Sequence, residues 1–171
     1  MSRPSNQRAM SKRSSARSGF SLIELLIVVA IILIIAAIAI PNLLRSRIAA
    51  NEASAIASIR TLITVNHSYN STYMSGFAPS MAALGPPAGG GAASAVAADL
   101  IDSVFAAGTK SGYTFTYAPA PAAAGIIYAY ALNADPVTPG TTGQRYFFTD
   151  QSGVIRFSTT AKAVVTDQPI P

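Results

Sequence analysis

A run of apolar residues near the amino terminus constrains this chain more than any other feature of its sequence. Every residue from Leu25 to Ile40 is apolar, and extending the run back to Phe20 adds only two polar positions, Ser21 and Glu24. As an α-helix this stretch is about 31 Å long, which is enough to cross the hydrocarbon layer of a bilayer. The sequence therefore predicts one membrane-spanning helix near the start of the chain.

The positive charge of the chain is concentrated before this run. The formal net charge of +5 comes from the bases that precede Gly19, with no acid among them: Arg3, Arg8, Lys12, Arg13 and Arg17. The seven remaining bases are balanced by seven acids, so residues 20–171 have no formal net charge. Because positive residues beside a membrane helix stay cytoplasmic, we expect the C-terminal part to face outward across a bacterial inner membrane.

The position of the small residues indicates cleavage before the apolar run and not after it. An ordinary secretory signal has a small-residue cleavage site on the far side of its apolar core. Here Ile40-Pro41-Asn42 follows the run, whereas Ser18-Gly19-Phe20 precedes it. Cleavage after Gly19 would remove residues 1–19 as a leader peptide and leave the apolar segment on the mature chain. A plain membrane anchor is the alternative explanation of the run alone.

Glu24 is difficult to reconcile with a plain anchor. An acid in a membrane helix costs roughly 2.5–3.5 kcal/mol at the helix centre and less near an end, so such a residue usually has a partner. After cleavage at Gly19, Glu24 lies about one turn from the new amine of Phe20, where the helix dipole favours an acid. We therefore expect Glu24 to neutralise the terminal amine of a neighbouring subunit and to set the axial register of assembly.

The segment GFSLIELLIVVAII, residues 19–32, resembles the prepilin cleavage and methylation motif of type IV pilins and type II secretion pseudopilins. The resemblance implies cleavage between Gly19 and Phe20 by a membrane aspartyl peptidase, N-methylation of Phe20 and a role for Glu24 in assembly. Pro41 matches the helix-kinking proline of family members. Because a leader of 19 residues is long for this group, we hypothesise that Met10 is the true start.

Beyond Pro41 the helical pattern continues to about Tyr73. Apolar residues recur at helical spacing, at Leu44, Ile48, Ala55, Ile59, Leu62 and Ile63. We expect residues 20–41 to form a transmembrane and polymerisation segment, and residues 42–74 to form an amphipathic half of the same helix. A loop rich in Gly, Pro and Ala is predicted from Ser75 to Ala95, followed by a short helix from about Ser94 to Ala107.

Residues 75–171 are predicted to form a C-terminal globular domain with an antiparallel sheet. Aromatic and branched residues mark strands at 113–117, 126–132, 145–149 and 154–157, and the turn 150–153 joins the last two as a hairpin. Packing one face of three or four strands on the amphipathic helix gives an α+β domain. A long N-terminal helix packed on a small sheet is the pilin fold that the resemblance implies.

The sequence predicts no enzyme, no metal and no cofactor. It contains no Gly-x-Ser-x-Gly, no phosphate loop, no His-Glu-x-x-His and no cysteine. Four oxygen-bearing residues could in principle meet around calcium, but their spacing matches no calcium loop: Asn133, Asp135, Asp150 and Asp167. Asn66-His67-Ser68 and Asn70-Ser71-Thr72 match the glycosylation acceptor pattern, which is weak evidence by itself.

These observations favour a structural subunit that is stored in the inner membrane and polymerised into a helical pilus filament through contacts that do not close. The expected partners are the prepilin peptidase and N-methyltransferase, an inner-membrane assembly platform, membrane lipid, and copies of itself or related pilins. A pseudopilin of a type II secretion system, in a periplasmic pseudopilus, is the first alternative.

A membrane-anchored minor pilin with a role in DNA uptake or adhesion is the second alternative. DNA binding requires a basic surface. The bases after residue 20 are scattered, so we do not expect nucleic acid as a partner: Arg45, Arg47, Arg60, Lys110, Arg145, Arg156 and Lys162. The sequence leaves open whether the subunit is major or minor and whether it binds calcium.

Overall fold

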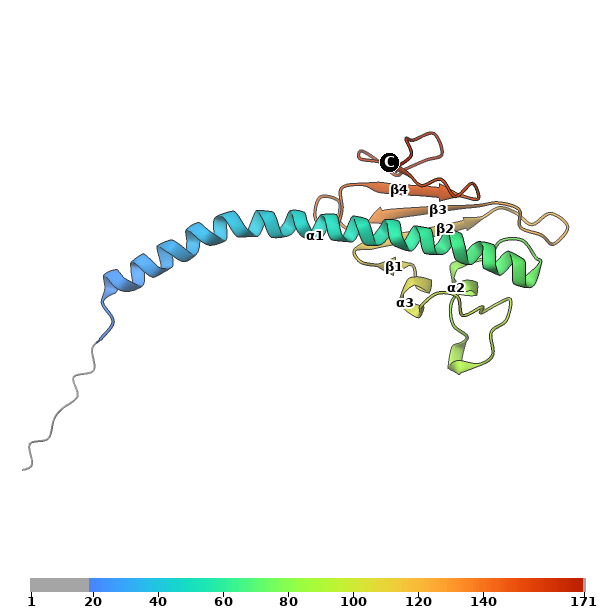
Figure 1. The fold of residues 1–171 in the computed structure, drawn as a ribbon, viewed down its shortest axis with the longest axis horizontal. Helices are drawn as coiled ribbons and strands as arrows, with labels where there is room; N and C mark the ends of the chain where they lie inside the picture. The colour runs from blue at the N-terminus through green and yellow to red at the C-terminus, as the bar shows by residue number, and fades with distance from the viewer. Residues whose placement is uncertain (1–18, 171) are drawn as a thin grey trace, which may run out of the picture. The chain divides into compact units, whose positions relative to one another are not determined.

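The computed structural model describes residues 19–170, so Met10 and all of the leader except Gly19 lie outside the described residues. The described residues divide into two parts, residues 19–40 and 41–170. Helix α1 (Leu22–Tyr73) begins in the first part and ends in the second (Figure 1). The other elements all belong to the second part: α2 (Met81–Leu84), η1 (Ala88–Gly90), α3 (Ser103–Ala106), β1 (Thr109–Lys110), β2 (Tyr113–Pro119), β3 (Tyr130–Pro136), β4 (Tyr146–Asp150) and β5 (Arg156–Ser158).

The first part consists of the apolar start of α1. Its side chains from Leu22 to Ile40 are exposed, apart from a half-buried Ala36. Each large aliphatic side chain left in water forgoes about 1.5–3 kcal/mol of burial free energy. The helix is long and apolar enough to cross a membrane, as the sequence predicts.

Helix α1 continues through Pro41. Proline has no backbone N–H, so the carbonyl four residues earlier loses its helical donor, but the flanking residues stay helical. The helix kink expected at Pro41 remains a prediction.

In the second part, one face of α1 packs on the sheet. Ile48, Ala55, Ile59 and Leu62 are buried, which confirms most of the predicted apolar stripe. Leu44 is an exception, because it is 42% exposed and lies before the first buried residue of the helix. The predicted stripe therefore began one turn too early.

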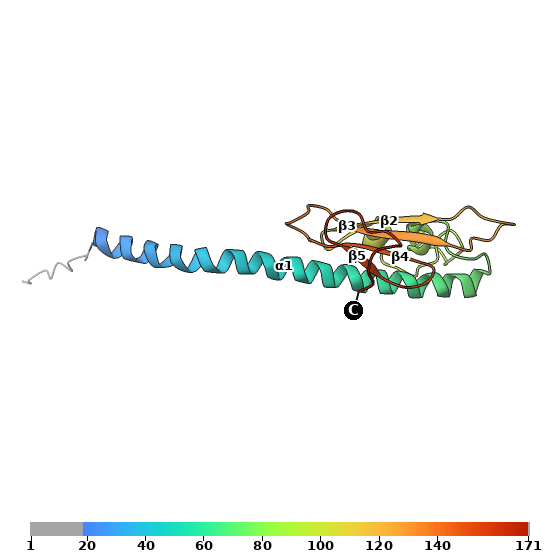
Figure 2. The ribbon, with the colours of Figure 1, turned by 90° about the horizontal axis from the view of Figure 1, so that it is seen from above.

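The five strands form an antiparallel sheet in the sequential order β1-β2-β3-β4-β5, which lies along one side of the second half of α1 (Figure 2). Side chains alternate between the helix-facing and solvent-facing sides. On β3, Tyr130, Leu132 and Ala134 are buried against the helix, whereas Asn133 and Asp135 lie on the outer face. This is the α+β arrangement predicted from the sequence.

The predicted hairpin at the end of the sheet is confirmed. Phe147 of β4 pairs with Phe157 of β5, and Gly153 adopts a positive φ of 73° in the connecting turn. The Asp150 side chain accepts the backbone N–H of Ser152 at 2.8 Å and so stabilises the turn. The sequence missed β1, because two residues give no periodic signal.

Two predictions between the helix and the sheet were wrong. The segment 75–95 is not merely a loop, because α2 buries Met81 and Leu84 in the core. Residues 94–107 are helical only in α3, which begins after the N-cap Asp102. The backbone N–H groups of Ala98 and Leu100 bond carbonyls of the α2 region instead of their own turn. Tertiary hydrogen bonds thus override the helix propensity of this Ala-rich segment.

Asn66 joins α1 to both the following loop and the sheet. It is fully buried, and its Oδ1 accepts the Ala78 N–H at 3.2 Å and lies 3.1 Å from the Tyr117 hydroxyl. Its Nδ2 donates to the Leu62 carbonyl at 3.2 Å. The Asn66 acceptor pattern therefore does not mark an accessible glycosylation site in the folded chain, whereas Asn70 is exposed.

Replacing Asn66 is expected to destabilise the second part of the chain. In Asn66→Ala the buried Ala78 N–H loses its acceptor, so we expect the free energy of unfolding to fall by about 1–3 kcal/mol. Denaturant unfolding of the full chain in detergent micelles, followed by circular dichroism, measures this change. Asn70→Ala, on the exposed face of the same helix, is the matched control and should change stability little; equal losses would contradict the role of Asn66.

Candidate functional site

The predicted cleavage site lies directly before α1. Gly19 and Phe20 are outside the helix and exposed, with 80% of the Phe20 surface accessible. A Cβ added at Gly19 would meet no atom of residues 19–170 within 4 Å, and the Gly19 backbone does not adopt a positive φ. The fold itself therefore does not demand glycine here, and a requirement for glycine would have to come from another molecule that reads this position.

Ser21 and Glu24 form one half of a capping box at the start of α1. The Glu24 Oε2 accepts the backbone N–H of Ser21 at 2.8 Å. In a capping box, the acid three residues after the N-cap returns to satisfy the N-cap N–H, which has no helical partner. The structure thus places the Glu24 carboxylate at the positive end of the helix dipole, one turn from Phe20.

This geometry gives Glu24 a partner within its own chain. A carboxylate that accepts a backbone hydrogen bond is less costly in an apolar environment than a bare one. Pairing of Glu24 with the amine of a neighbouring subunit requires a second copy, so it remains a prediction. Pro41 lies 17 residues further along α1 and is not part of this site.

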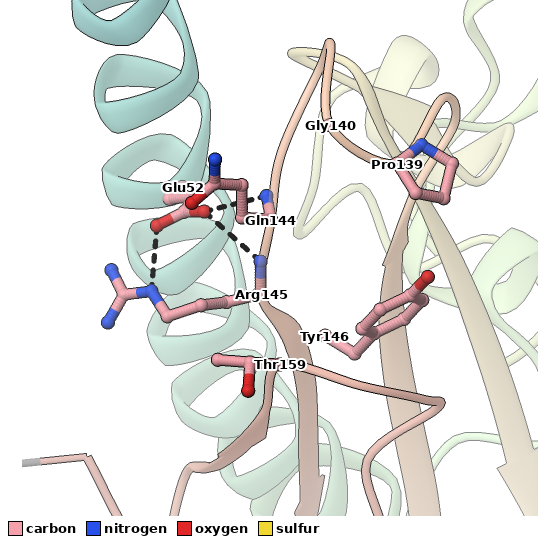
Figure 3. Close-up of a pocket in the computed structure, with 7 residues that line it drawn as sticks. All are labelled: Glu52, Pro139, Gly140, Gln144, Arg145, Tyr146 and Thr159. Carbon is pink, nitrogen blue, oxygen red and sulfur yellow. Dashed lines mark hydrogen bonds and ion pairs between the residues drawn. The ribbon is translucent and has the colours of Figure 1, made fainter.

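In the second part of the chain, Glu52 anchors α1 to the loop before β4 (Figure 3). It is only 7% exposed. Its Oε1 accepts the backbone N–H groups of Gln144 and Arg145 at 2.9 and 3.1 Å, and its Oε2 accepts Arg145 Nε at 2.7 Å. Both carboxylate oxygens are thus bound by donors, which compensates for burial of the charge.

Arg145 is held in place from several directions. Its guanidinium carbon lies 5.4 Å from the Phe147 ring centre and 5.6 Å from that of Phe157, within cation–π range. Its carbonyl accepts the Tyr113 hydroxyl at 2.8 Å. Burial, together with the Glu52 charge, raises the pKa of Tyr113 well above its usual value, so the phenol stays a neutral donor.

An open cavity of about 420 Å³ adjoins this anchor. Glu52, Gln144 and Arg145 form one side of it, and Pro139, Gly140, Tyr146 and Thr159 complete its lining. Because the acid is fully hydrogen-bonded, it is poorly suited to act as a general base. The sequence did offer a signal for the anchor, since Glu52 is a charged residue within the buried face between Ile48 and Ala55.

The four residues considered for calcium do not converge. Asp150 pairs with Ala131, four residues from Asp135 along β3, and the Asn133 Nδ2 donates to the Ala163 carbonyl at 2.8 Å. The Asp167 Oδ2 accepts the Val164 N–H at 2.8 Å. Within residues 19–170, no group of three or more His, Cys, Asp or Glu side chains is placed to hold a metal ion.

Comparison with known proteins supports the amino-terminal resemblance. Residues 14–40 match the family model of the prokaryotic N-terminal methylation motif. The chain is 47% identical over 60 residues to the type IV wide pilus major component PilA4 of Thermus thermophilus. This match covers 33% of the chain and 46% of that relative, so the chain spans less than half the length of the relative that it matches. No solved structure matches.

These matches confirm that the chain carries a prepilin-type amino terminus and is similar to a type IV pilin. They concern the segment that contains Gly19, Phe20 and Glu24, for which processing and assembly roles are predicted from the sequence. The Glu52 anchor was not predicted and was found only in the structure.

Substituting Glu52 is expected to loosen the contact between α1 and the β4 loop. In Glu52→Gln an amide N–H faces the Arg145 donor and the guanidinium loses its counter-charge, which should cost about 2–4 kcal/mol of unfolding free energy. Denaturant titration of the full chain in micelles measures the loss. The control Glu24→Gln, in the exposed segment, should leave this transition unchanged; equal effects would refute the anchor.

Asp135 should make stability depend on pH in the opposite sense to most acids. Burial raises its pKa, opposed only in part by Lys162 at 3.9 Å, and its Oδ1 is buried without a hydrogen-bond partner. The folded form therefore binds this proton more tightly, so stability falls as pH rises from the unfolded to the folded pKa. We expect Asp135→Asn to be more stable than the parent chain at neutral pH and equally stable at acid pH, as measured by denaturant unfolding at each pH. A loss of stability at neutral pH would contradict the interpretation.

Proposed function

We propose that this chain, which carries a prepilin-type amino terminus, is a structural subunit that is cleaved between Gly19 and Phe20, N-methylated on Phe20 and polymerised into a pilus filament. The observation that supports this most directly is the exposed apolar half of α1, headed by Glu24. Such a helix needs a non-aqueous environment, which lipid supplies before assembly and neighbouring helices supply afterwards.

Glu24 favours transfer of the subunit from the lipid bilayer into the filament. Within residues 19–170 of the single chain the carboxylate accepts the Ser21 N–H, whereas in a filament the charged amine of a neighbouring Phe20 would add a counter-charge. An ion pair in a low-dielectric bundle is stabilising only when its geometry is good, so the pair selects one axial register. Contacts of this kind repeat from subunit to subunit and yield an open helical fibre.

The partners and location follow from this cycle. The five leader bases hold the amino terminus in the cytoplasm, where prepilin peptidase and N-methyltransferase would act. The domain of residues 41–171 would lie outside the inner membrane, and an assembly platform would lift the subunit into a surface pilus. We propose a structural role and no catalysis for this domain.

Two alternatives are distinguished by where the processed chain is found. A type II pseudopilin would share every amino-terminal step but end in a periplasmic fibre. A DNA-uptake subunit would need free bases on its globular domain. The bases that follow Arg60 are all engaged: Lys110 pairs with Asp102 at 2.8 Å, Arg145 with Glu52 and Lys162 with Asp135, and Arg156 donates to the Asp167 carbonyl. The description of the Thermus relative as a pilus major component favours the pilus.

Mass spectrometry of filaments sheared from native cells tests the proposal. We expect a chain that begins at N-methylated Phe20. In Gly19→Val the uncut precursor should accumulate without loss of fold, because a Cβ added at this position meets no atom of residues 19–170 within 4 Å. Glu24→Gln should be cleaved normally but be lost from the sheared fraction.

The location and the processing state of the chain distinguish the pilus subunit from its alternatives. A processed chain confined to the envelope would favour the pseudopilin, and an uncut chain in wild-type cells would leave only a membrane anchor. Ile23→Val, which preserves the apolar surface beside Glu24, is the matched control and should assemble normally.

A further inference from the structure

Arg45 and Arg47 lie where the exposed stretch of α1 gives way to its packed stretch. Every residue from Pro41 to Arg47 is exposed, and Ile48 is the first buried residue of the helix. In the sequence, no other charged residue occurs between Glu24 and Glu52. The two arginines are therefore the first charges that follow the apolar segment on its outward side.

Neither arginine is engaged by the part of the chain that the structure describes. The ion pairs in residues 19–170 join Lys110 to Asp102, Arg145 to Glu52 and Lys162 to Asp135. At 3.6 residues per turn, positions 45 and 47 are about 200° apart around the helix axis. The two side chains thus project to opposite sides of α1. This arrangement lets both of them contact a layer that surrounds the helix, whereas a ligand on one face of the helix would contact only one of them.

The length of helix that precedes the two arginines matches the hydrocarbon core of a bilayer. About 20 residues separate the start of the uninterrupted run at Leu25 from Leu44, and as a helix they rise about 30 Å, the thickness of the hydrocarbon core. Guanidinium groups just beyond this point reach the level of the lipid phosphates, while their aliphatic stems lie along the acyl chains. A guanidinium can bind a phosphate with two parallel hydrogen bonds.

We propose that Arg45 and Arg47 form a headgroup collar that binds the phosphates of anionic phospholipids and fixes the depth of the subunit in the membrane before assembly. The inference rests on the proposed function, since it concerns the stored subunit. Anionic lipids attract each arginine near the surface, so the collar favours membranes that contain them. Transfer into a filament then requires both arginines to leave lipid phosphates.

The absence of cysteine from the chain makes the collar measurable. A spin label attached to Ser46→Cys in the full chain, inserted into phosphatidylcholine vesicles, reports how well a water-soluble relaxing agent reaches the position between the arginines. Adding a minority of phosphatidylglycerol should lower that access about twofold, because the collar then holds the label among the headgroups. The change should disappear in Arg45→Gln/Arg47→Gln.

Arg60→Gln is the matched control. It removes an exposed arginine from the same helix about 20 Å beyond Arg47, which exceeds the screening length of about 10 Å. The control should keep the full response to phosphatidylglycerol. The leader bases are identical in all variants, so they cannot account for a difference between them. An equal response in the double variant, or no response in the parent chain, would overturn the collar.

A second label at Ala37→Cys separates failure of the collar from failure of the membrane role. Access of dissolved oxygen, which partitions into the hydrocarbon, should be high at this position in every variant. If position 37 is lipid-exposed but position 46 does not respond, the membrane role stands and the collar is wrong. If position 37 is reached by the water-soluble agent instead, the membrane role itself is wrong and the collar fails with it.

Discussion

The cost of exposing an apolar helix to water governs the architecture of this chain. From Leu22 to Ile40 the helix has almost no buried side chain, so its stability depends on an environment that the single chain cannot provide. Residues 41–171 are built differently, with a core in which Ile59 and Leu62 of α1 face Leu132 and Phe147 of the sheet. One helix therefore contributes to a buried core at one end and leaves its apolar side chains exposed at the other.

Polar groups within α1 adapt the helix to these two settings. Glu24 is exposed and satisfies a free N–H at the helix start, so it can change partners at little cost. Glu52 is buried and bound by three donors from one loop, so losing any of them leaves a charge or a donor unsatisfied. Glu24 can therefore exchange its hydrogen-bond partner, whereas Glu52 cannot, because the two carboxylates differ in burial and in the number of donors that bind them.

Features encoded by local pattern could be predicted from the sequence, and those that depend on distant contacts could not. The apolar run, the helix to Tyr73 and the β4–β5 hairpin follow from composition, periodicity and turn chemistry. The segment 94–107 was misjudged because carbonyls near α2 capture its N–H groups. Asn66 matches a glycosylation pattern in the sequence but is a buried connector in the structure, since only the folded chain brings Ala78 and Tyr117 to it. At the amino terminus the candidate site is continuous in sequence, so Gly19, Phe20 and Glu24 could be proposed as its residues without a structure.

The Glu52 anchor has a mechanical consequence for a fibre built from such subunits. The carboxylate and the donors on Gln144 and Arg145 come from segments more than ninety residues apart, so the anchor is a long-range cross-link between helix and sheet. When a fibre is stretched, load enters each domain along α1 and reaches the sheet as shear across this link. Three hydrogen bonds on one carboxylate share that load with the buried apolar contacts of the helix. The strength of such a fibre would then depend on how firmly each domain holds its own helix, and Glu52 contributes a polar link to that hold.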